Sequence, residues 1–200
     1  MIKTTPPSTM GLSSAGSVAG NVYTGSDTDA FRSAMRRVVS GVTVVTTLHD
    51  GRPWGMTVNA FSSVCAEPPT ILVCVNNRTV TASDIAKDGR FAANLLTQDQ
   101  LHLSGLCARP GAVKYLDGYT VATPEFSEQV TMPVLRDSLV TFDCKVSEVR
   151  PVGSHFVVIA AVEAIVVPSA RTPLLYGEGR YMHGVTLEES PAMLTALAWA

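Results

Sequence analysis

The chain has 200 residues and a mass of 21.2 kDa, which is typical of a single domain that buries its core without disulfides or a structural metal. Charged residues make up 16% of the chain and the formal net charge is -2, so the sequence lacks the basic character that nucleic acids and anionic membranes attract. Its longest strongly apolar stretch, residues 156–167, is shorter than the roughly 20 residues that span a bilayer.

Residues 1–26 are rich in Ser, Thr, Gly and Pro and predict a flexible tail. Pro6 and Pro7 stand where a signal peptide needs its apolar run, so we expect a cytoplasmic protein. The four cysteines have apolar neighbours and no metal-ligand spacing, which favours reduced thiols in the core and no metal site. These cysteines are Cys65, Cys74, Cys107 and Cys144.

A first helix is expected from residues 27–29, because apolar side chains then recur at helical spacing until Gly41. Those side chains are Phe31, Met35, Val38 and Val39. Residues 42–48 alternate in the manner of a strand, and the turn Asp50-Gly51 leads to a second strand from Trp54. This pattern predicts a β-hairpin.

Further strands are expected at residues 70–75 and 91–96, with a short helix at 81–87 that Gly89 ends. A second helix at 98–108 precedes an irregular segment, residues 109–135, and segments of that length are usually functional or disordered.

Residues 140–147 alternate cleanly, and the turn at 151–154 leads to an apolar strand from His155. A C-terminal helix is expected over residues 188–200, with Ser190-Pro191 at its start. Several strands without regular strand–helix alternation favour an antiparallel barrel with peripheral helices over a doubly wound sheet.

The most informative segment is residues 54–70. On one continuous strand, Thr57, Asn59 and Phe61 share a face that continues into Ser62 and Ser63. Neutral donors and acceptors in a row suit a planar heterocycle that carries a polyol or a phosphate. The alternative reading is a solvated strand face that ends in a Ser-rich turn.

Six motifs over residues 30–184 resemble, in their order, the flavin reductase-like family with its FMN-binding split β-barrel. They are GVTVVTT (41–47), PWGMTVNAFSSV (53–64), EPPTILVCV (67–75), GRFAANLL (89–96), the turn at 151–156 and PLLYGEGRY (173–181).

The resemblance implies a mainly β fold, a six-stranded antiparallel split β-barrel of Greek-key type over residues 27–187, in a homodimer. It also implies an NAD(P)H:flavin oxidoreductase that reduces FMN or FAD by hydride transfer and supplies the diffusing reduced flavin to a separate monooxygenase. The choices between FMN and FAD, and between NADH and NADPH, stay open at this point.

The resemblance also implies a set of site residues. The isoalloxazine and ribityl contacts are assigned to Thr57, Val58, Asn59 and Ala60. The segment near the phosphate is assigned to Ser62, Ser63 and Thr81, with Lys114 or Arg78 as a point charge. Cys74 and Asn76 border the flavin, and Tyr176 and Tyr181 border the nicotinamide or pack a dimer interface.

His155 is the candidate catalytic residue, because it stands where the family has the His of a Gly-Asp-His turn and would contact the nicotinamide. This chain has Ser154 where the family has the Asp, and residues 76–80 lack the Ser that usually precedes Thr81. The alternatives are a non-catalytic flavin carrier, a flavin-dependent reductase of another ligand such as a corrinoid, and an interaction module on the same barrel.

Overall fold

The structure, a computed structural model, describes residues 21–121, 128–168 and 171–184. The chain divides into two units, residues 1–35 and 36–200. The expected C-terminal helix and most of the expected N-terminal tail lie outside the described residues. Among the helices that the described residues form, none is long and apolar enough to cross a membrane.

The first unit contains helix α1, Thr28–Met35, where Asp27 Oδ1 accepts a hydrogen bond of 2.8 Å from the amide of Ala30. The helix buries none of its residues and ends at Met35, so the expectation that it continues to Gly41 is wrong. In the second unit Ser40–Gly41 forms strand β1, which pairs with residues 175–176. Long-range strand pairing therefore overrides the local helical spacing.

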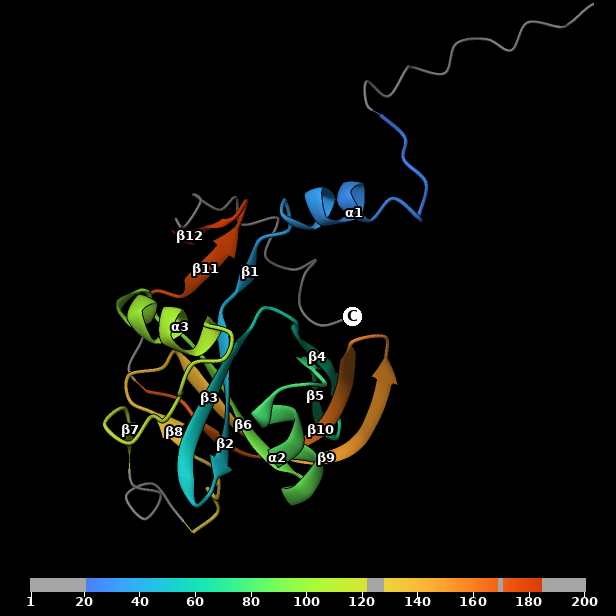
Figure 1. Ribbon diagram of the computed structural model, residues 1–200. Helices are drawn as coiled ribbons and strands as arrows, with labels where there is room; N and C mark the ends of the chain where they lie inside the picture. Colours follow the sequence, from blue (N-terminus) through green and yellow to red (C-terminus); the bar gives the residue numbers. More distant parts are fainter. Residues whose placement is uncertain (1–20, 122–127, 169–170, 185–200) are drawn as a thin grey trace, which may run out of the picture. The chain divides into compact units, whose positions relative to one another are not determined.

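The second unit is built on an antiparallel sheet of seven strands, in the order β3-β2-β6-β9-β10-β5-β4 (Figure 1). Its strands are β2 Thr43–His49, β3 Arg52–Val58, β4 Phe61–Ala66, β5 Pro69–Asn76, β6 Arg90–Leu95, β9 Val140–Val152 and β10 His155–Val166. The predicted hairpins β2–β3 and β9–β10 are both confirmed.

Among the described residues, two smaller sheets accompany the large one. The first joins β1 to the hairpin of β11, Leu174–Gly177, and β12, Arg180–His183. The second pairs β7, Thr120–Val121, with β8, Val134–Leu135, inside the segment that the sequence predicts to be irregular.

Strands β3 and β4 lie at opposite edges of the seven-stranded sheet, yet only Asn59 and Ala60 separate them in the chain. The sheet must therefore curl until its two edges meet at this end, in the manner of a barrel. The Phe61 amide donates to the Asn59 carbonyl at 3.1 Å, and the Cys74 amide donates to the Ala60 carbonyl at 3.1 Å. The expected count of six strands is wrong, because this break divides one expected strand into β3 and β4.

The described residues of this unit form three helical segments: α2 Val80–Asp88, the 3-10 turn η1 Gln98–Gln100 and α3 Leu101–Ala108. Strand β2 is buried on both faces, since Val45 packs in a core with Ile85 of α2, while Val44 packs in a second core with Leu103 of α3. The two helices therefore cover opposite faces of the β2–β3 edge, and β3 runs between them.

The cysteines are free thiols that differ in burial. Cys107 and Cys144 are buried in the two cores, and Cys74 is half-buried. Cys65 is exposed on the edge strand β4, so the expectation of a core thiol is wrong for this residue.

Candidate functional site

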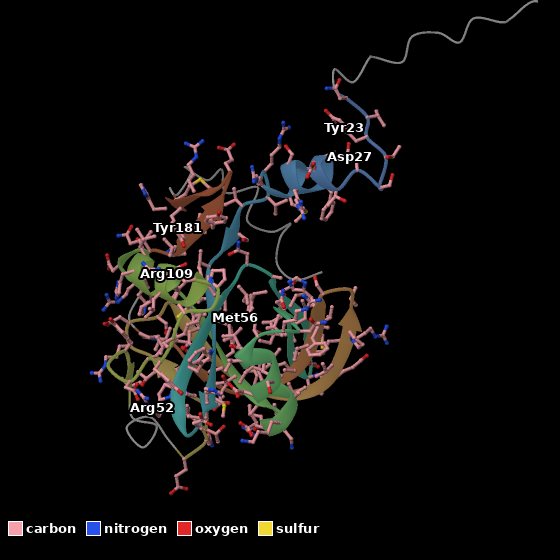
Figure 2. All side chains as sticks on the ribbon, in the orientation of Figure 1. Tyr23, Asp27, Arg52, Met56, Arg109 and Tyr181 are labelled. Carbon is pink, nitrogen blue, oxygen red and sulfur yellow. The ribbon has the colours of Figure 1, made fainter. Side chains whose placement is uncertain are left out.

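A cavity of about 650 Å³ lies against the edge strand β3. It is bounded by the end of β5, the first turn of α2, the end of α3 and the loop that follows α3, and Met56 marks its β3 wall (Figure 2). The lining residues are Trp54, Met56, Thr57, Asn76, Arg78, Thr79, Val80, Thr81, Cys107, Ala108, Pro110, Gly111, Ala112, Val113 and Lys114.

The edge of β3 presents backbone groups to this cavity. The Leu116 amide donates to the Pro53 carbonyl at 2.9 Å, and the Gly55 amide donates to the Lys114 carbonyl at 3.1 Å. Backbone groups of an antiparallel strand alternate between its two sides, so those of Thr57 also point outward from the sheet. Residues 114–116 cover β3 only as far as Gly55, and the edge at Thr57 faces the cavity.

Helix α2 begins at the cavity with an unusual hydroxyl. The Thr79 Oγ1 caps the helix by accepting a bond of 3.3 Å from the Ala82 amide. The Thr81 Oγ1, in the first turn, is fully buried and has no hydrogen-bond partner among the described residues. Because a buried hydroxyl without a partner costs about 1–3 kcal/mol, a ligand that supplies the missing partner is favoured here.

The charges around the cavity favour an anion. Arg78 and Lys114 both line it, and none of its described lining residues is acidic. Burial lowers the pKa of Lys114, and the nearby Cys107 opposes that shift. The first amides of α2 and the positive end of its dipole add to the same potential. Burial also raises the pKa of Cys107 to about 12, which keeps the thiol neutral.

Helix α2 is fixed to the sheet by a buried carboxylate. Asp84 accepts a hydrogen bond of 2.9 Å from the Thr47 hydroxyl and lies 3.1 Å from Nδ1 of His49, both on β2. Since β2 also pairs with β3, the two walls of the cavity are held by the same strand.

Of the site residues expected from sequence, the structure brings Thr57, Asn76, Thr81 and Lys114 together around this cavity. Val58 is buried in the core, while Asn59 and Ala60 are exposed at the break after β3. Ser62 and Ser63 are exposed on β4, and the half-buried Cys74 lies on β5; these residues do not line the cavity.

The expectation that Thr57, Asn59 and Phe61 share one strand face is wrong. The chain turns at Asn59–Ala60, after which Phe61 packs against Phe142 with 5.8 Å between ring centroids. Asn59 is a residue type common in turns, but the alternation of side chains continues through it, so the alternation alone cannot find this break.

His155 begins β10 and is exposed. It pairs in register with Asn76, a lining residue, and its Nδ1 lies 2.9 Å from the Ser154 hydroxyl. His155 therefore lies one strand away from the cavity and does not itself line it.

Tyr176 and Tyr181 pair on the β11–β12 hairpin, with ring centroids 5.3 Å apart. The Tyr181 hydroxyl lies 2.9 Å from the Ser104 hydroxyl on α3, and the Ser104 carbonyl accepts a bond of 2.8 Å from the Thr57 hydroxyl. The hairpin thus reaches the cavity wall through Ser104.

Sequence reasoning missed the wall formed by residues 107–113 and the role of Ser104. A signal for the wall was present, since a long Gly- and Pro-rich segment after residue 108 is typical of functional loops. Ser104 carried no such signal, because its contacts join three segments that are distant in sequence.

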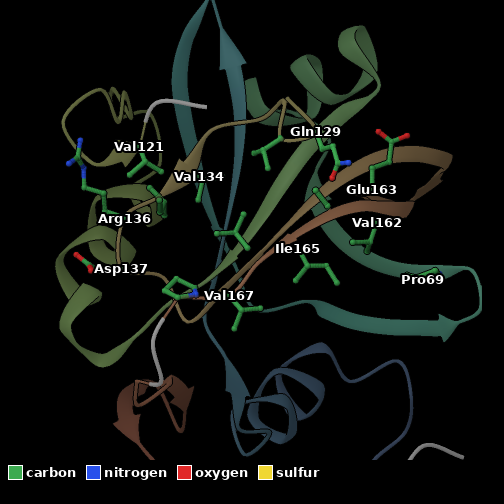
Figure 3. Close-up of a pocket in the computed structure, with 15 residues that line it drawn as sticks. Pro69, Val121, Gln129, Val134, Arg136, Asp137, Val162, Glu163, Ile165 and Val167 are labelled. Carbon is green, nitrogen blue, oxygen red and sulfur yellow. The ribbon is translucent and has the colours of Figure 1, made fainter. Parts of the chain in front are cut away.

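A second cavity of about 830 Å³ lies between β10 and the β7–β8 pair (Figure 3). Most of its described walls are apolar, and its charged residues are engaged within the chain: Arg136 donates to the Thr120 carbonyl, and Glu163 pairs with Arg90. Asp137 likewise pairs with Arg171 at 2.8 Å. The cavity between β3 and α2, which Thr81 with its unpartnered hydroxyl lines, is therefore the better candidate site.

The chain is similar to known proteins over most of its length. A family model described as "Flavin reductase like domain" matches residues 35–184. The reductase component of a 4-nitrophenol 4-monooxygenase/4-nitrocatechol 2-monooxygenase from Rhodococcus opacus is 36% identical over 165 residues, which are 82% of this chain and 85% of that protein. An FMN reductase (NADH) from Methylorubrum populi is 35% identical over 82% of this chain and 79% of its own length.

Among solved structures, the flavin reductase of the styrene monooxygenase from Pseudomonas putida S12 has a TM-score of 0.67 and 29% identity. The similarity covers 78% of this chain and 98% of that chain.

Proposed function

This chain belongs to the flavin reductase-like domain family, and from that premise we propose that it reduces a flavin with NAD(P)H and supplies the reduced flavin to a separate monooxygenase. Relatives that match most of its length carry names of this kind, as reductase components of monooxygenases and as FMN reductases. The proposal extends those activities to this chain.

The observation that carries the proposal is the buried, unpartnered hydroxyl of Thr81, a residue in the wall of a cationic cavity. A flavin phosphate supplies acceptor oxygens for that hydroxyl and for the first amides of α2, and a negative charge for Arg78 and Lys114. A cavity of about 650 Å³ is within the range of cofactor-sized sites. The residues present therefore fit a flavin nucleotide.

The remaining wall suits the flavin ring. Met56 and Trp54 offer apolar surface, while the open edge of β3 at Thr57 offers backbone hydrogen-bonding groups. A bound flavin supplies the capacity to accept a hydride from a nicotinamide, and the protein's task is to bind and align the two rings. This requires no general acid, in keeping with the neutral side chains at the β3 wall.

We assign the nicotinamide side of the site to His155 and to the Tyr176–Tyr181 pair. His155 supports this assignment because it is exposed beside Asn76, and Tyr181 because it is tied through Ser104 to Thr57. The exposed Asn59, Ala60, Ser62 and Ser63 then lie at the mouth of the site, next to the break between β3 and β4.

We further propose a homodimer, because large apolar side chains are exposed on three of the four strands that follow β6 in the sheet order. They are Val64 on β4, Val149 and Val152 on β9, and Ile165 on β10. Strand β4 is also an uncharged edge strand, a type of surface that proteins usually cover.

The function is tested by anaerobic stopped-flow absorbance, in which the purified chain is mixed with FMN or FAD and with NADH or NADPH in all four pairings. We expect rapid bleaching of the oxidised flavin in at least one pairing, and this pairing also identifies the cofactors. In the same assay, His155→Ala should raise KM for the nicotinamide more than KM for the flavin. Bound flavin that no nicotinamide bleaches would contradict the reductase and leave a flavin carrier.

A further inference from the structure

The hydroxyl of Thr57 donates its hydrogen to a backbone carbonyl. It lies 2.8 Å from the backbone carbonyl of Ser104, and a carbonyl oxygen only accepts hydrogen bonds. The hydrogen of Thr57 therefore points at Ser104. Thr57 also lines the cavity, and a hydroxyl whose hydrogen is donated to Ser104 can only accept a hydrogen bond from a ligand that reaches it.

The carbonyl that fixes this hydrogen is itself held in place. Ser104 is fully buried, and its side chain is bonded to the Tyr181 hydroxyl at 2.9 Å. Helix α3 also packs closely on β3, because Gly55 has no side chain to keep Cys107 and Leu116 away. Rotation of the Thr57 hydroxyl toward the cavity would break its bond to Ser104.

We infer that Thr57 serves the flavin solely as a hydrogen-bond acceptor and therefore recognises a ring N–H of the isoalloxazine. This inference rests on the proposed function. Oxidised flavin carries one such group, N3–H, and two-electron reduction adds N5–H. A flavin carbonyl at the same place would meet a second acceptor, which costs binding energy. Ser104 is the positioning residue, because its carbonyl accepts the hydrogen of the Thr57 hydroxyl and leaves the Thr57 oxygen as an acceptor.

The test compares Thr57→Val, which keeps the side-chain shape but has no acceptor, with Thr57→Ser, which keeps the hydroxyl. Dissociation constants are measured for oxidised flavin and, under anaerobic conditions, for reduced flavin. We expect Thr57→Val to weaken binding roughly three- to tenfold, the usual size of one neutral hydrogen bond, and Thr57→Ser to stay within about twofold of the wild type.

A matched control is Thr70→Val. Thr70 also donates from its hydroxyl to a backbone carbonyl at 2.8 Å, that of Pro68, but it does not line the cavity. This variant should bind both forms of flavin as the wild type does. Thermal melts of the three variants without flavin show whether each remains folded.

The pattern of losses identifies the donor. Weaker binding of both redox forms to Thr57→Val indicates N3–H, and the wild type should then disfavour N3-methylated flavin while Thr57→Val does not. Weaker binding of the reduced form alone indicates N5–H. Wild-type affinity of Thr57→Val for both forms, or an equal loss in Thr57→Ser, overturns the inference while flavin reduction by the wild type stands. A wild type that binds no flavin overturns the proposed function as well.

Discussion

Two threonines of this fold bury a hydroxyl that has no partner among the described residues, and they differ in what surrounds them. Thr43 lies at the start of β2, away from the cavity lining, and Thr81 lies in the first turn of α2, which lines it. An unsatisfied buried hydroxyl destabilises the free protein wherever it lies. Thr81 alone lies on the wall of the cavity in which we propose that a flavin phosphate binds.

We predict that Thr81→Val weakens FMN binding roughly tenfold to hundredfold, because a hydrogen bond to a charged group contributes about 1.5–3 kcal/mol. Binding of riboflavin, which has no phosphate, should change little. The free variant should be more stable to thermal unfolding by about 1 kcal/mol, since it no longer buries an unpaired hydroxyl. Fluorescence titration and calorimetry measure these quantities.

Thr43→Val is the matched control for this prediction. It should raise the stability of the free protein by a similar amount and leave FMN affinity unchanged. If the two variants lose FMN affinity equally, or if Thr81→Val loses riboflavin affinity as well, Thr81 does not contact a phosphate.

At the scale of elements, the sequence predicts β-hairpins better than it predicts the break between β3 and β4. The β2–β3 hairpin is recognisable because alternation flanks Asp50-Gly51, both of which adopt the positive φ that such a turn needs. The end of α2 is equally clear, because Gly89 adopts a left-handed conformation there. These signals are local, so one segment of sequence contains all of the information.

The parts of the site that sequence reasoning missed depend on contacts between segments. The place of Thr81 at the start of a helix could be predicted from sequence, but the wall at 107–113 depends on how closely α3 approaches β3. The break at Asn59–Ala60 depends on β4 pairing with β5, which no residue type at the break announces. For the same reason, Ser104 has no sequence signal.

We predict that Gly55→Ala destabilises the protein by about 1–3 kcal/mol, the usual cost of overpacking. A methyl group at Gly55 would lie 2.6 Å from Leu116 Cδ1 and 2.8 Å from Cys107 Sγ, and both side chains belong to the segments that cover β3. Flavin affinity should fall too, because Cys107 lines the cavity.

Gly105→Ala is the control on the same helix α3, where a methyl group meets nothing within 4 Å. It should raise stability by up to about 1 kcal/mol, since Ala is the better helix former. Urea unfolding of both variants shows whether the free energy of unfolding falls for Gly55→Ala and rises for Gly105→Ala. A Gly55→Ala variant as stable as the wild type would show that α3 can shift away from β3 at no cost.

At the scale of the whole molecule, the proposed homodimer predicts a mass of about twice 21.2 kDa by light scattering at micromolar concentration. The exposed side chains that support it are apolar, so the dimer should persist at high salt, which screens charge but not hydrophobic contacts. A mass of 21.2 kDa across that concentration range would rule the dimer out.

The sheet order has a consequence for how the chain acquires its site. The two walls of the cavity, β3 and the junction of β5 with α2, stand near opposite ends of the strand order, and the route between them along the sheet passes through β2, β6, β9 and β10. The pairing of β5 with β10, which joins Asn76 to His155, has the largest sequence separation along this route, and closing so long a loop costs entropy. Isolated hairpins therefore have no site, and a ligand that binds only the closed sheet raises the folded fraction by mass action. The supply of flavin would then help to set how much of this protein survives proteolysis.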